Sequence, residues 1–369
     1  MNRKEEKNVY KVESMDQKYK KWFIRVVMIA MTAFLLFTGL VVYVDPFFQY
    51  HKPLERFPYL IDNQLSQNPG MAKNWEYDSV ILGSSMTVNF NTDWFSEILD
   101  LKTAKLSFNG AHPKDQSNIM DIIFKSPNHV KTVFLGIDIP AYSSDVEATK
   151  YPIPEYLYDE NYLNDIFYVL NKDVLLNYIL RAVADPKDKT AIPTMYALWW
   201  TDEYFNKQYV LQYYEPPKIV TKEAPEETYL ERVKDNLDIN ICPYIEANPD
   251  TEFVVFYPPY SILYWYGINR ENKLNATLAE FQYVSERLLP YNNVRIFNFQ
   301  DQEEIITDLN NYADYDHYHG DINRFMVNCF ADGTCELTKK NLSDSLEAMR
   351  ILAVNYDYDS IFEGEQNGD

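Results

Sequence analysis

The chain has 369 residues, of which 46% are hydrophobic and 24% charged, enough for one large packed domain or two small ones with appendages. The net charge of −21 argues against nucleic acid as a partner, because phosphate binding needs a basic surface. Aromatic residues make up 16% of the chain and include 31 tyrosines. Tyrosine-rich surfaces suit polar ligands such as sugars, although half-buried packing explains the tyrosines equally well.

The N-terminal part of the chain predicts one membrane span. Residues 26–44, VVMIAMTAFLLFTGLVVYV, contain no charge and no proline. A helix of that length just crosses a hydrocarbon core of about 30 Å. Residues 1–25 carry eight Lys/Arg against four acids, a charge of +4, and the rest of the chain carries −25. The positive-inside rule therefore places residues 1–25 in the cytoplasm and the rest outside, as an extracellular domain on a single-pass cell-membrane anchor.

A cleaved signal peptide is the alternative interpretation of this segment. The apolar run is long for a signal peptide, and no A-x-A cleavage site follows it. The cysteines are compatible with an external location. Cys329 and Cys335 flank an Asp-Gly turn in CFADGTC, which suits a small disulfide loop, and Cys242 is left over. No pair has the CxxC spacing of a zinc site, and we expect neither a metal nor another cofactor.

After the span, short apolar runs alternate with helical patterns. The apolar runs are typical of strands that are buried on both faces, and they cover residues 79–83, 103–108, 131–139, 252–259 and 294–299. Helical patterns lie between several of them, as at 112–126 and 272–289. The alternation predicts an α/β fold with a five-stranded parallel sheet.

The spacing of these runs suggests the domain organisation. The third and fourth runs are separated by about residues 140–250, and the Tyr-, Pro- and Trp-rich stretch within them predicts an insertion that covers one end of the sheet. A helix over 226–248 would return the chain to the sheet. The expected parts are a cytoplasmic tail (1–25), the transmembrane helix (26–44), a juxtamembrane segment (45–75), the ectodomain (76–355) and a disordered polar tail (356–369).

Two serines stand directly after the first predicted strand, in SVILGSSMT. Ligands of open α/β sheets bind at the carboxyl ends of the strands, which is where Ser84 and Ser85 would lie. Backbone N–H groups at such a turn can stabilise an oxyanion. A serine becomes a nucleophile only when a base takes its proton and a third group orients that base. Without such partners, the two serines would merely cap a helix.

Two of the five histidines follow the last predicted strand, in NYADYDHYHGDIN. This segment holds two overlapping D-x-x-H patterns, Asp314 with His317 and Asp316 with His319. Either pattern lets a carboxylate accept one imidazole N–H while the other ring nitrogen faces a serine. Surface histidines in a tyrosine-rich loop are the alternative. The order of the motifs, with serines after the first strand and D-x-x-H after the last, favours a site.

Together these motifs resemble membrane-anchored members of the SGNH (GDSL-like) hydrolase superfamily, which accompany membrane-bound O-acyltransferases in modifying bacterial surface polysaccharides. The D-alanyl-lipoteichoic acid biosynthesis D protein and the alginate acetylation proteins are relatives of this type. The similar stretches span most of residues 45–330 and are VILGSSMT, KLSFNGAHPKDQ, VFLGIDIP, IPEYLYDENYLNDIFYVLNKDVL, FYPPYS and DYDHYHGDIN. The resemblance implies a flavodoxin-like three-layer sandwich.

The resemblance also implies roles for individual residues. Ser85 matches the nucleophile, while His317 and Asp314 match the base and its orienting carboxylate. Asp316 and His319 form the alternative register. Ser84 stands where soluble members have Asp, a position at which anchored members commonly have Ser.

The implied oxyanion hole consists of the N–H groups of Ser85 and Gly110, with Asn109 as a further donor. His112, two residues after Gly110, either lines the site or begins a helix. One position departs from the family pattern, because Asp138 in GIDI stands where soluble members have the Asn of G-x-N-D. An ionised carboxylate cannot donate a hydrogen bond and repels an oxyanion. The hole then uses its other donors, or the site is inactive.

The implied function is that of an extracytoplasmic serine acyltransferase or esterase. It would O-acetylate a cell-surface polysaccharide or a teichoic-acid-like polymer, and a membrane-bound O-acyltransferase would supply the acyl groups. A catalytically inactive SGNH-fold scaffold of a cell-envelope polymer-modification complex is the alternative, which the departure at Asp138 favours. An esterase acting on small esters is a third, weaker interpretation.

Overall fold

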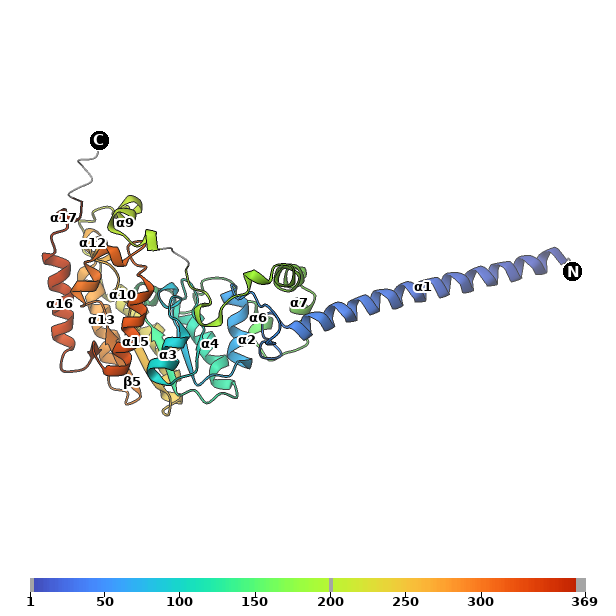
Figure 1. Ribbon diagram of the computed structural model, residues 1–369, viewed down its shortest axis with the longest axis horizontal. Helices are drawn as coiled ribbons and strands as arrows, with labels where there is room; N and C mark the ends of the chain where they lie inside the picture. Colours follow the sequence, from blue (N-terminus) through green and yellow to red (C-terminus); the bar gives the residue numbers. More distant parts are fainter. Residues whose placement is uncertain (1–2, 199–201, 363–369) are drawn as a thin grey trace, which may run out of the picture.

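The computed structural model describes residues 3–198 and 202–362, with side chains from residue 17 onward. Figure 1 shows an α/β body from which the N-terminal helix projects. The strands are β1 (Ser79–Leu82), β2 (Thr103–Lys105), β3 (Thr132–Gly136), β4 (Glu252–Tyr257), β5 (Val294–Asn298) and β6 (Glu336–Leu337). The α-helices are α1 (Arg3–Val44), α2 (Gln64–Asn74), α3 (Thr92–Leu99), α4 (Pro113–Lys125), α5 (Ile139–Tyr142), α6 (Glu155–Tyr158), α7 (Ile166–Val169), α8 (Arg181–Ala184), α9 (Lys207–Tyr213), α10 (Glu226–Asn236), α11 (Cys242–Ala247), α12 (Ile262–Arg270), α13 (Leu274–Leu288), α14 (Glu303–Ile306), α15 (Gly320–Asp332), α16 (Leu342–Asn355) and α17 (Asp359–Phe362). Short 3₁₀ turns and π-helices join them at η1 (Ser85–Thr87), η2 (Val174–Leu180), η3 (Pro186–Asp188), η4 (Ile192–Thr194), η5 (Asp202–Tyr204), η6 (Leu237–Ile241) and η7 (Leu309–Asn311).

The sheet has six strands in the order β2-β1-β3-β4-β5-β6. All five predicted runs form strands, and these five are parallel. The prediction of five strands misses β6, which pairs antiparallel with the end of β5 through only two residues. Such a short edge strand leaves no periodic pattern in the sequence.

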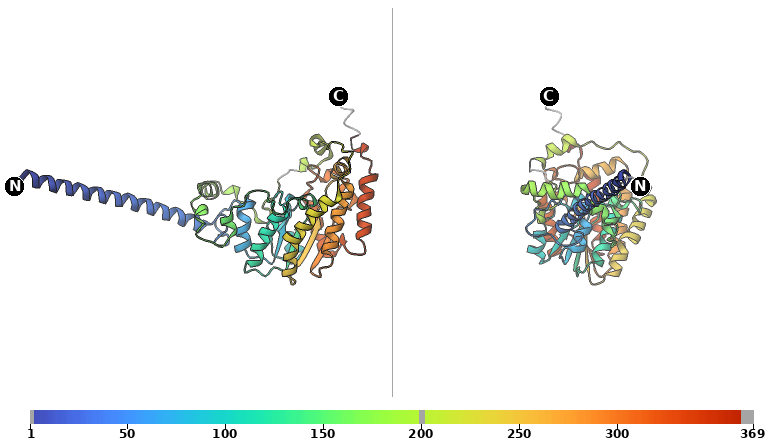
Figure 2. Two further views of the ribbon diagram at one scale, coloured as in Figure 1. Left: turned by 180° about the vertical axis from the view of Figure 1, so that it is seen from behind. Right: turned by 90° about the vertical axis from the view of Figure 1, so that its right-hand side faces the viewer.

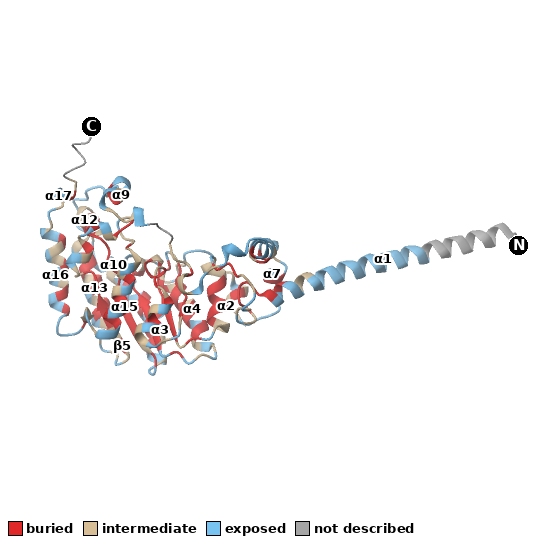
Figure 3. Cartoon of the chain, in the orientation of Figure 1, coloured by how far each residue is buried: buried red, intermediate tan, exposed pale blue. Residues whose placement is uncertain are grey.

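The central strands are buried along their whole length, as their apolar sequences require. Every residue of β1 and β3 is buried. Helices α3 and α15 cover one face of the sheet, and α4, α10 and α13 cover the other (Figures 1 and 2). Figure 3 shows the buried residues gathered in the sheet and on the helix faces against it. The fold is therefore a mixed α/β structure built around a mainly parallel sheet.

The connection pattern reverses the direction of strand addition at β1. From β1 the chain passes through α3 to β2 on one side, and then through α4 to β3 on the other side of β1. In open α/β sheets, ligands bind where the order of the strands reverses in this way, outside the carboxyl ends of the strands. The residues that follow β1 and β3 lie at that point.

The N-terminal helix is longer than the predicted span. Helix α1 continues without a break through the basic segment, and its part Gln17–Val44 is apolar and long enough to cross a membrane. Most of its side chains between residues 17 and 40 are exposed, in contrast to a core helix. The chain therefore carries one N-terminal helix suited to a single-pass anchor.

The structure also shows what becomes of three other sequence predictions. Helix α10, η6 and α11 form the helical return over Glu226–Ala247, while Trp199 and Trp200 of the aromatic-rich insertion lie outside the described residues. The predicted tail begins with a folded part, because α17 buries Ile361, and residues 363–369 lie outside the described residues. The Sγ atoms of Cys329 and Cys335 are 3.8 Å apart. A disulfide needs about 2.05 Å, so the predicted bridge is not formed in this structure.

Candidate active site

A sharp turn after β1 presents the two serines. Gly83 has φ +150°, and a Cβ atom added there would lie 2.5 Å from Cγ2 of Thr87, so the turn needs glycine. The Ser84 hydroxyl accepts a hydrogen bond from the Met86 N–H at 3.2 Å and caps η1. The Thr87 hydroxyl donates to the Ser84 carbonyl at 2.8 Å. Ser84 thus has the capping role, and the hydroxyl of Ser85 faces a different group.

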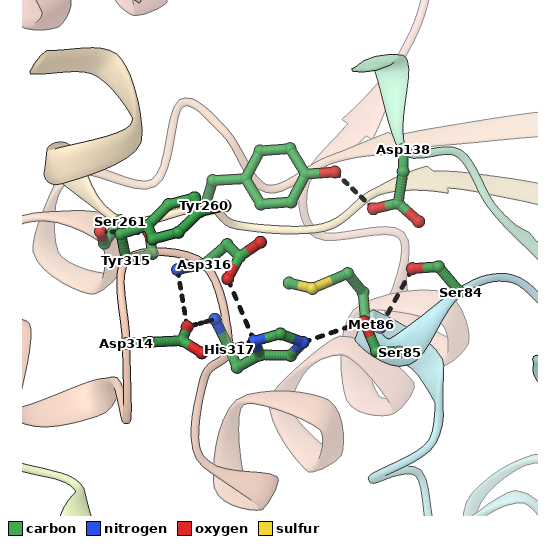
Figure 4. A network of polar contacts seen from close by, with 10 residues as sticks. All are labelled: Ser84, Ser85, Met86, Asp138, Tyr260, Ser261, Asp314, Tyr315, Asp316 and His317. Carbon is green, nitrogen blue, oxygen red and sulfur yellow. Dashed lines mark hydrogen bonds and ion pairs between the residues drawn. The ribbon is translucent and has the colours of Figure 1, made fainter. Parts of the chain in front are cut away.

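That group is His317, which lies 232 residues later in the chain. Its Nε2 is 2.9 Å from Oγ of Ser85. Its Nδ1 is 2.8 Å from Oδ2 of Asp314 and 3.0 Å from Oδ1 of Asp316 (Figure 4). The structure therefore brings together the predicted serine, imidazole and carboxylate, and adds a second carboxylate to the same ring nitrogen.

The structure does not bring His319 to Ser85. His319 precedes α15, and its Nδ1 accepts a hydrogen bond from the Asp321 N–H at 3.2 Å. Its ring meets the ring of Phe205 edge-on at 4.7 Å, and its Nε2 is 3.6 Å from Asp202 of the insertion. Of the two D-x-x-H registers, the one with His317 faces the serine.

Local hydrogen bonds shape the loop that carries His317. Oδ1 of Asp314 accepts from the N–H groups of Asp316 and His317 at 3.0 and 2.7 Å, which is an Asx-type turn. The buried hydroxyl of Tyr318 donates to the Met86 carbonyl at 2.7 Å and so ties this loop to the turn after β1. Tyr318 is a positioning residue that the sequence analysis missed, because nothing marks one tyrosine among 31.

The two carboxylates control the charge of the imidazole. Burial alone would lower the pKa of His317, but hydrogen bonds and charge interactions with Asp314 and Asp316 raise it to about 10. Burial also opposes ionisation of Asp314, but its interactions with His317 hold its pKa below the ordinary value. The pKa of the more deeply buried Asp316 is raised. The two carboxylates therefore favour the charged imidazolium, in which Nε2–H would donate to Ser85.

Asp138 follows β3 at the same edge of the sheet. Its Oδ1 accepts a hydrogen bond from the Tyr260 hydroxyl, and its buried Oδ2 has no well-formed hydrogen bond within the described part of the chain. Oδ2 lies on the side of the Ser84 hydroxyl (Figure 4). Burial raises the pKa of Asp138. This effect outweighs the lowering of that pKa by the side-chain contacts with Ser84 and Tyr260 and by the charge of His317. When it is neutral, the carboxyl group of Asp138 can donate a hydrogen bond through its O–H. The Asn of the G-x-N-D pattern donates one through its amide N–H.

The other predicted oxyanion donors follow β2. The Phe108 N–H donates to the Gly83 carbonyl at 2.9 Å, so the turn after β2 lies beside the turn after β1. Gly110 in that turn has φ +67°. The Asn109 N–H donates to Oε1 of Gln64 at 2.9 Å, and Oδ1 of Asn109 accepts from Nε2 of Gln64 at 3.3 Å. These contacts leave the Gly110 N–H and the Asn109 side-chain N–H groups as the candidate donors.

His112 lies at the start of α4. Its N–H donates to Asp115 at 2.9 Å, and its Nδ1 is 3.0 Å from the Ser144 hydroxyl. These contacts give it the helix-start role, which was one of the two sequence interpretations.

Asp314, Asp316 and His317 also form a cluster with the composition of a metal site. Their ligand atoms all lie within 4.8 Å of one another. Direct contacts between Nδ1 and both carboxylates, at hydrogen-bond distance, account for this cluster without an ion.

The buried side chain of Lys105 holds the segment that follows the turn after β1. Nζ of Lys105 donates to the carbonyls of Val88 and Phe90 at 2.6 and 2.7 Å, and the residue is fully buried. No carboxylate in the described residues pairs with it, and burial lowers its pKa to about 7. The sequence signal was a single lysine inside the apolar run TAKLSF. Lys105 holds the segment that follows Ser85.

We expect Lys105→Met to lower the free energy of unfolding by about 2 kcal/mol, because it leaves two buried carbonyls without a donor. The labelling of Ser85 described below should also slow. Since folding lowers the lysine pKa from 10.5 to about 7, the unfolded chain binds more protons between these pH values. Stability should therefore rise with pH across that window, and this contribution should vanish in the variant.

Denaturant unfolding of the detergent-solubilised chain at several pH values tests this. Lys102→Met is the matched control, because Lys102 is exposed and 3.4 Å from exposed Glu76. Such a pair contributes about 0–1 kcal/mol. Equal effects of the two substitutions would contradict a supporting role for Lys105.

No family model matches the chain, and no curated protein matches it. The chemistry of the site therefore rests on its geometry.

Proposed function

We propose that this protein is a membrane-anchored, extracytoplasmic serine acyltransferase or esterase of the SGNH type that O-acetylates a cell-surface polysaccharide or teichoic-acid-like polymer. The observation that carries the proposal is the hydrogen-bonded array of Ser85, His317 and Asp314 at the strand-order reversal. The strand order 2-1-3-4-5 of the parallel strands supports a flavodoxin-like sandwich, in which ligands bind at this point.

The proposed reaction has two half-steps. His317, once neutral, takes the proton of Ser85 as Oγ attacks the acyl carbonyl, and the same proton then goes to the leaving oxygen of the donor. A covalent acyl-serine remains. In the second step His317 takes a proton from the acceptor hydroxyl as its oxygen attacks the acyl carbon. The bond from the acyl carbon to Oγ then breaks, and His317 gives that proton to Oγ of Ser85. Asp314 holds the imidazole with Nε2 towards the serine.

The developing oxyanion would be met by N–H groups of Ser85 and Gly110 and by the side-chain amide of Asn109. Asp138 does not oppose this charge when it is neutral, and its raised pKa supports the neutral form. Removing one oxyanion donor typically costs about 10²–10³ in rate, which is the loss that a hole without the family's Asn amide would carry. The N-terminal helix supports a position at the membrane. The cell-surface acceptor and the acyl supply through a membrane-bound O-acyltransferase are part of the proposal that comes from the resemblance.

The second candidate is a catalytically inactive scaffold of a polymer-modification complex. The observation that favours it is the raised pKa of His317, because an imidazolium cannot accept the serine proton. The two candidates differ in whether Ser85 reacts.

A fluorophosphonate probe separates the two candidates. We expect the full-length protein in detergent to be labelled at Ser85, with the site located by mass spectrometry, and Ser85→Ala to lose the label. Ser84→Ala is the control, since it removes a neighbouring hydroxyl that caps η1. Absence of label at Ser85 from pH 7 to 10, with an unchanged circular dichroism spectrum, would favour the scaffold.

A further inference from the structure

The segment around α7, η2 and α8 is apolar on two opposite sides. One side packs into the domain through Tyr168, Val169, Val174, Ile179 and Ala182, which are buried. The other side exposes large apolar side chains, which we call the apolar ridge: Leu163, Phe167, Leu170, Leu176, Leu180 and Val183. Leu163 is 89% exposed and Phe167 is 65% exposed. A water-exposed helix normally has a polar outer side, so this ridge requires a partner.

The exposed apolar side chains follow one another along the whole segment. Leu163, Phe167 and Leu170 lie in and beside α7, and Leu176, Leu180 and Val183 lie in η2 and α8. Two of the nearby cations are paired with acids, Lys172 with Asp173 at 2.8 Å and Arg181 with Asp188 at 3.1 Å. The side chains of the ridge are themselves uncharged, so the ridge selects its partner by apolar contact more than by charge.

The ridge lies where α1 enters the domain. The ring of Phe47, three residues after α1, stacks on Tyr168 at 5.3 Å and meets Tyr178 edge-on at 4.9 Å. Figure 1 shows α7 and its neighbouring helical turns beside this end of α1. The segment 174–184 is seen end-on there and from the side in the right-hand view of Figure 2, so it lies crosswise to α1.

The junction between α1 and this segment is rigid. Buried Asp45 accepts hydrogen bonds from the Tyr168 hydroxyl at 2.8 Å and from the N–H groups of Gln49 and Tyr50 at 2.9 and 2.6 Å. Val41 and Val44 of the last turn of α1 are 0% and 4% exposed, because they pack against the domain. The position of the ridge relative to α1 is therefore fixed by the fold.

The length of the span determines where the ridge lies relative to the membrane surface. The uncharged run 26–44 has 19 residues and is about 28 Å long at 1.5 Å per residue. A run of that length matches about 30 Å of hydrocarbon, so its two ends lie near the two boundaries when it is the part that crosses. The last turn of α1 consequently lies at the outer boundary of the hydrocarbon, and the segment in contact with it lies at the same level.

We propose that the apolar ridge is an interfacial membrane-binding surface, which lies in the boundary between headgroups and acyl chains beside the transmembrane helix. A helix that lies parallel to the membrane and buries one apolar face by about 5–10 Å is a common way to bind a bilayer surface. Together with α1, the ridge gives the domain two attachments and one fixed tilt. This inference is independent of the serine chemistry.

Lipid-borne quenchers test the proposal with the full chain in phosphatidylcholine vesicles purified by flotation. Single cysteines replace Phe167 or Leu180 in a Cys335→Ser background, where Cys242 and Cys329 are buried, and carry a nitrobenzoxadiazole label. Doxyl groups near the headgroup quench labels at this depth. Val354→Cys is the matched control, because Val354 is 58% exposed on α16, at the end of the domain far from α1 (Figure 1). Leu36→Cys in α1 provides the reference for a membrane-embedded label.

We expect the labels at 167 and 180 to lose fluorescence to nearly the extent of the label at 36, while the label at 354 is unaffected. Replacing part of the lipid by phosphatidylglycerol should change the result little. Quenching at 167 and 180 no greater than at 354 would overturn the proposal and assign the ridge to a protein partner or a second copy of the chain. An unquenched label at 36 would overturn it as well, because α1 would then not span the bilayer.

Discussion

Replacing His317 by alanine is expected to slow fluorophosphonate labelling of Ser85 by about 10⁴- to 10⁶-fold, the range seen when the base of a serine–histidine–carboxylate site is removed. The physical reason is that Oγ of Ser85 has its base at 2.9 Å in Nε2 of His317. Without that nitrogen, the serine proton has to go to water.

Labelling rates of the full-length protein, followed by in-gel fluorescence at pH 9, measure this effect. His319→Ala is the matched control, because His319 belongs to the same loop and contacts Asp321 and the insertion rather than the serine. Its rate should stay within a few-fold of that of the unaltered protein. Comparable losses in both variants would indicate a disturbed loop, and no loss in either would remove His317 from the base role.

Replacing Asp316 by asparagine is expected to increase Ser85 labelling at pH 7 by about 10- to 100-fold. With a His317 pKa of about 10, only about one imidazole in 10³ is neutral at pH 7. Removing one of the two carboxylates at Nδ1 lowers that pKa, and each unit raises the neutral fraction about tenfold. The pH at which the labelling rate levels off should move down by one to two units.

Asp314→Asn provides the contrast. Its Oδ1 can still accept the N–H groups of Asp316 and His317, but the amide NH2 would replace Oδ2 and cannot accept a hydrogen bond from Nδ1 of His317. That variant should lose orientation along with charge and label slowly at every pH. Folding stability gives an independent check on Asp316→Asn. The raised pKa of His317 stabilises the fold fully below pH 6.5, and this stabilisation is lost as the pH rises through about 10. Asp316→Asn should therefore lose less stability than the unaltered protein as the pH rises from 7 to 10. A pH–rate profile that does not move would show that Asp316 does not influence the imidazole.

These expectations describe a site held in a protonated resting state. Two carboxylates on one imidazole keep His317 charged at neutral pH, whereas a single orienting carboxylate would leave more of it neutral. If the site is catalytic, a change that moves Asp316 away from Nδ1 would activate Ser85 without altering the nucleophile.

The amino-acid sequence by itself determined the elements that depend on local pattern. Strands buried on both faces have continuous apolar runs, and all five predicted runs form parallel strands. An uncharged run of 19 residues marks the span. Serines after the first strand and D-x-x-H after the last fell on the same edge of the sheet, because parallel strands share their carboxyl ends. That is why the motif order could bring the two serines and the two D-x-x-H patterns together, while the preference for Ser85, Asp314 and His317 came from the resemblance.

The tertiary structure alone decided the features that depend on packing between distant segments. The choice of His317 over His319 follows from the Asx-type turn and from the Tyr318 hydroxyl on Met86. The short β6 exists only through its pairing with β5.

The charge states of buried groups also depend on packing between segments that are distant in the sequence. Desolvation and partners that are distant in sequence set the pKa values of His317, Asp138 and Lys105, and no spacing of residues reveals burial of that depth. The apolar ridge looked like ordinary core in the sequence, because only the packing of its opposite side showed that these leucines and Phe167 face outward. Pattern fixes which face of a strand or helix is apolar, but only the folded chain decides which apolar faces find a partner within it.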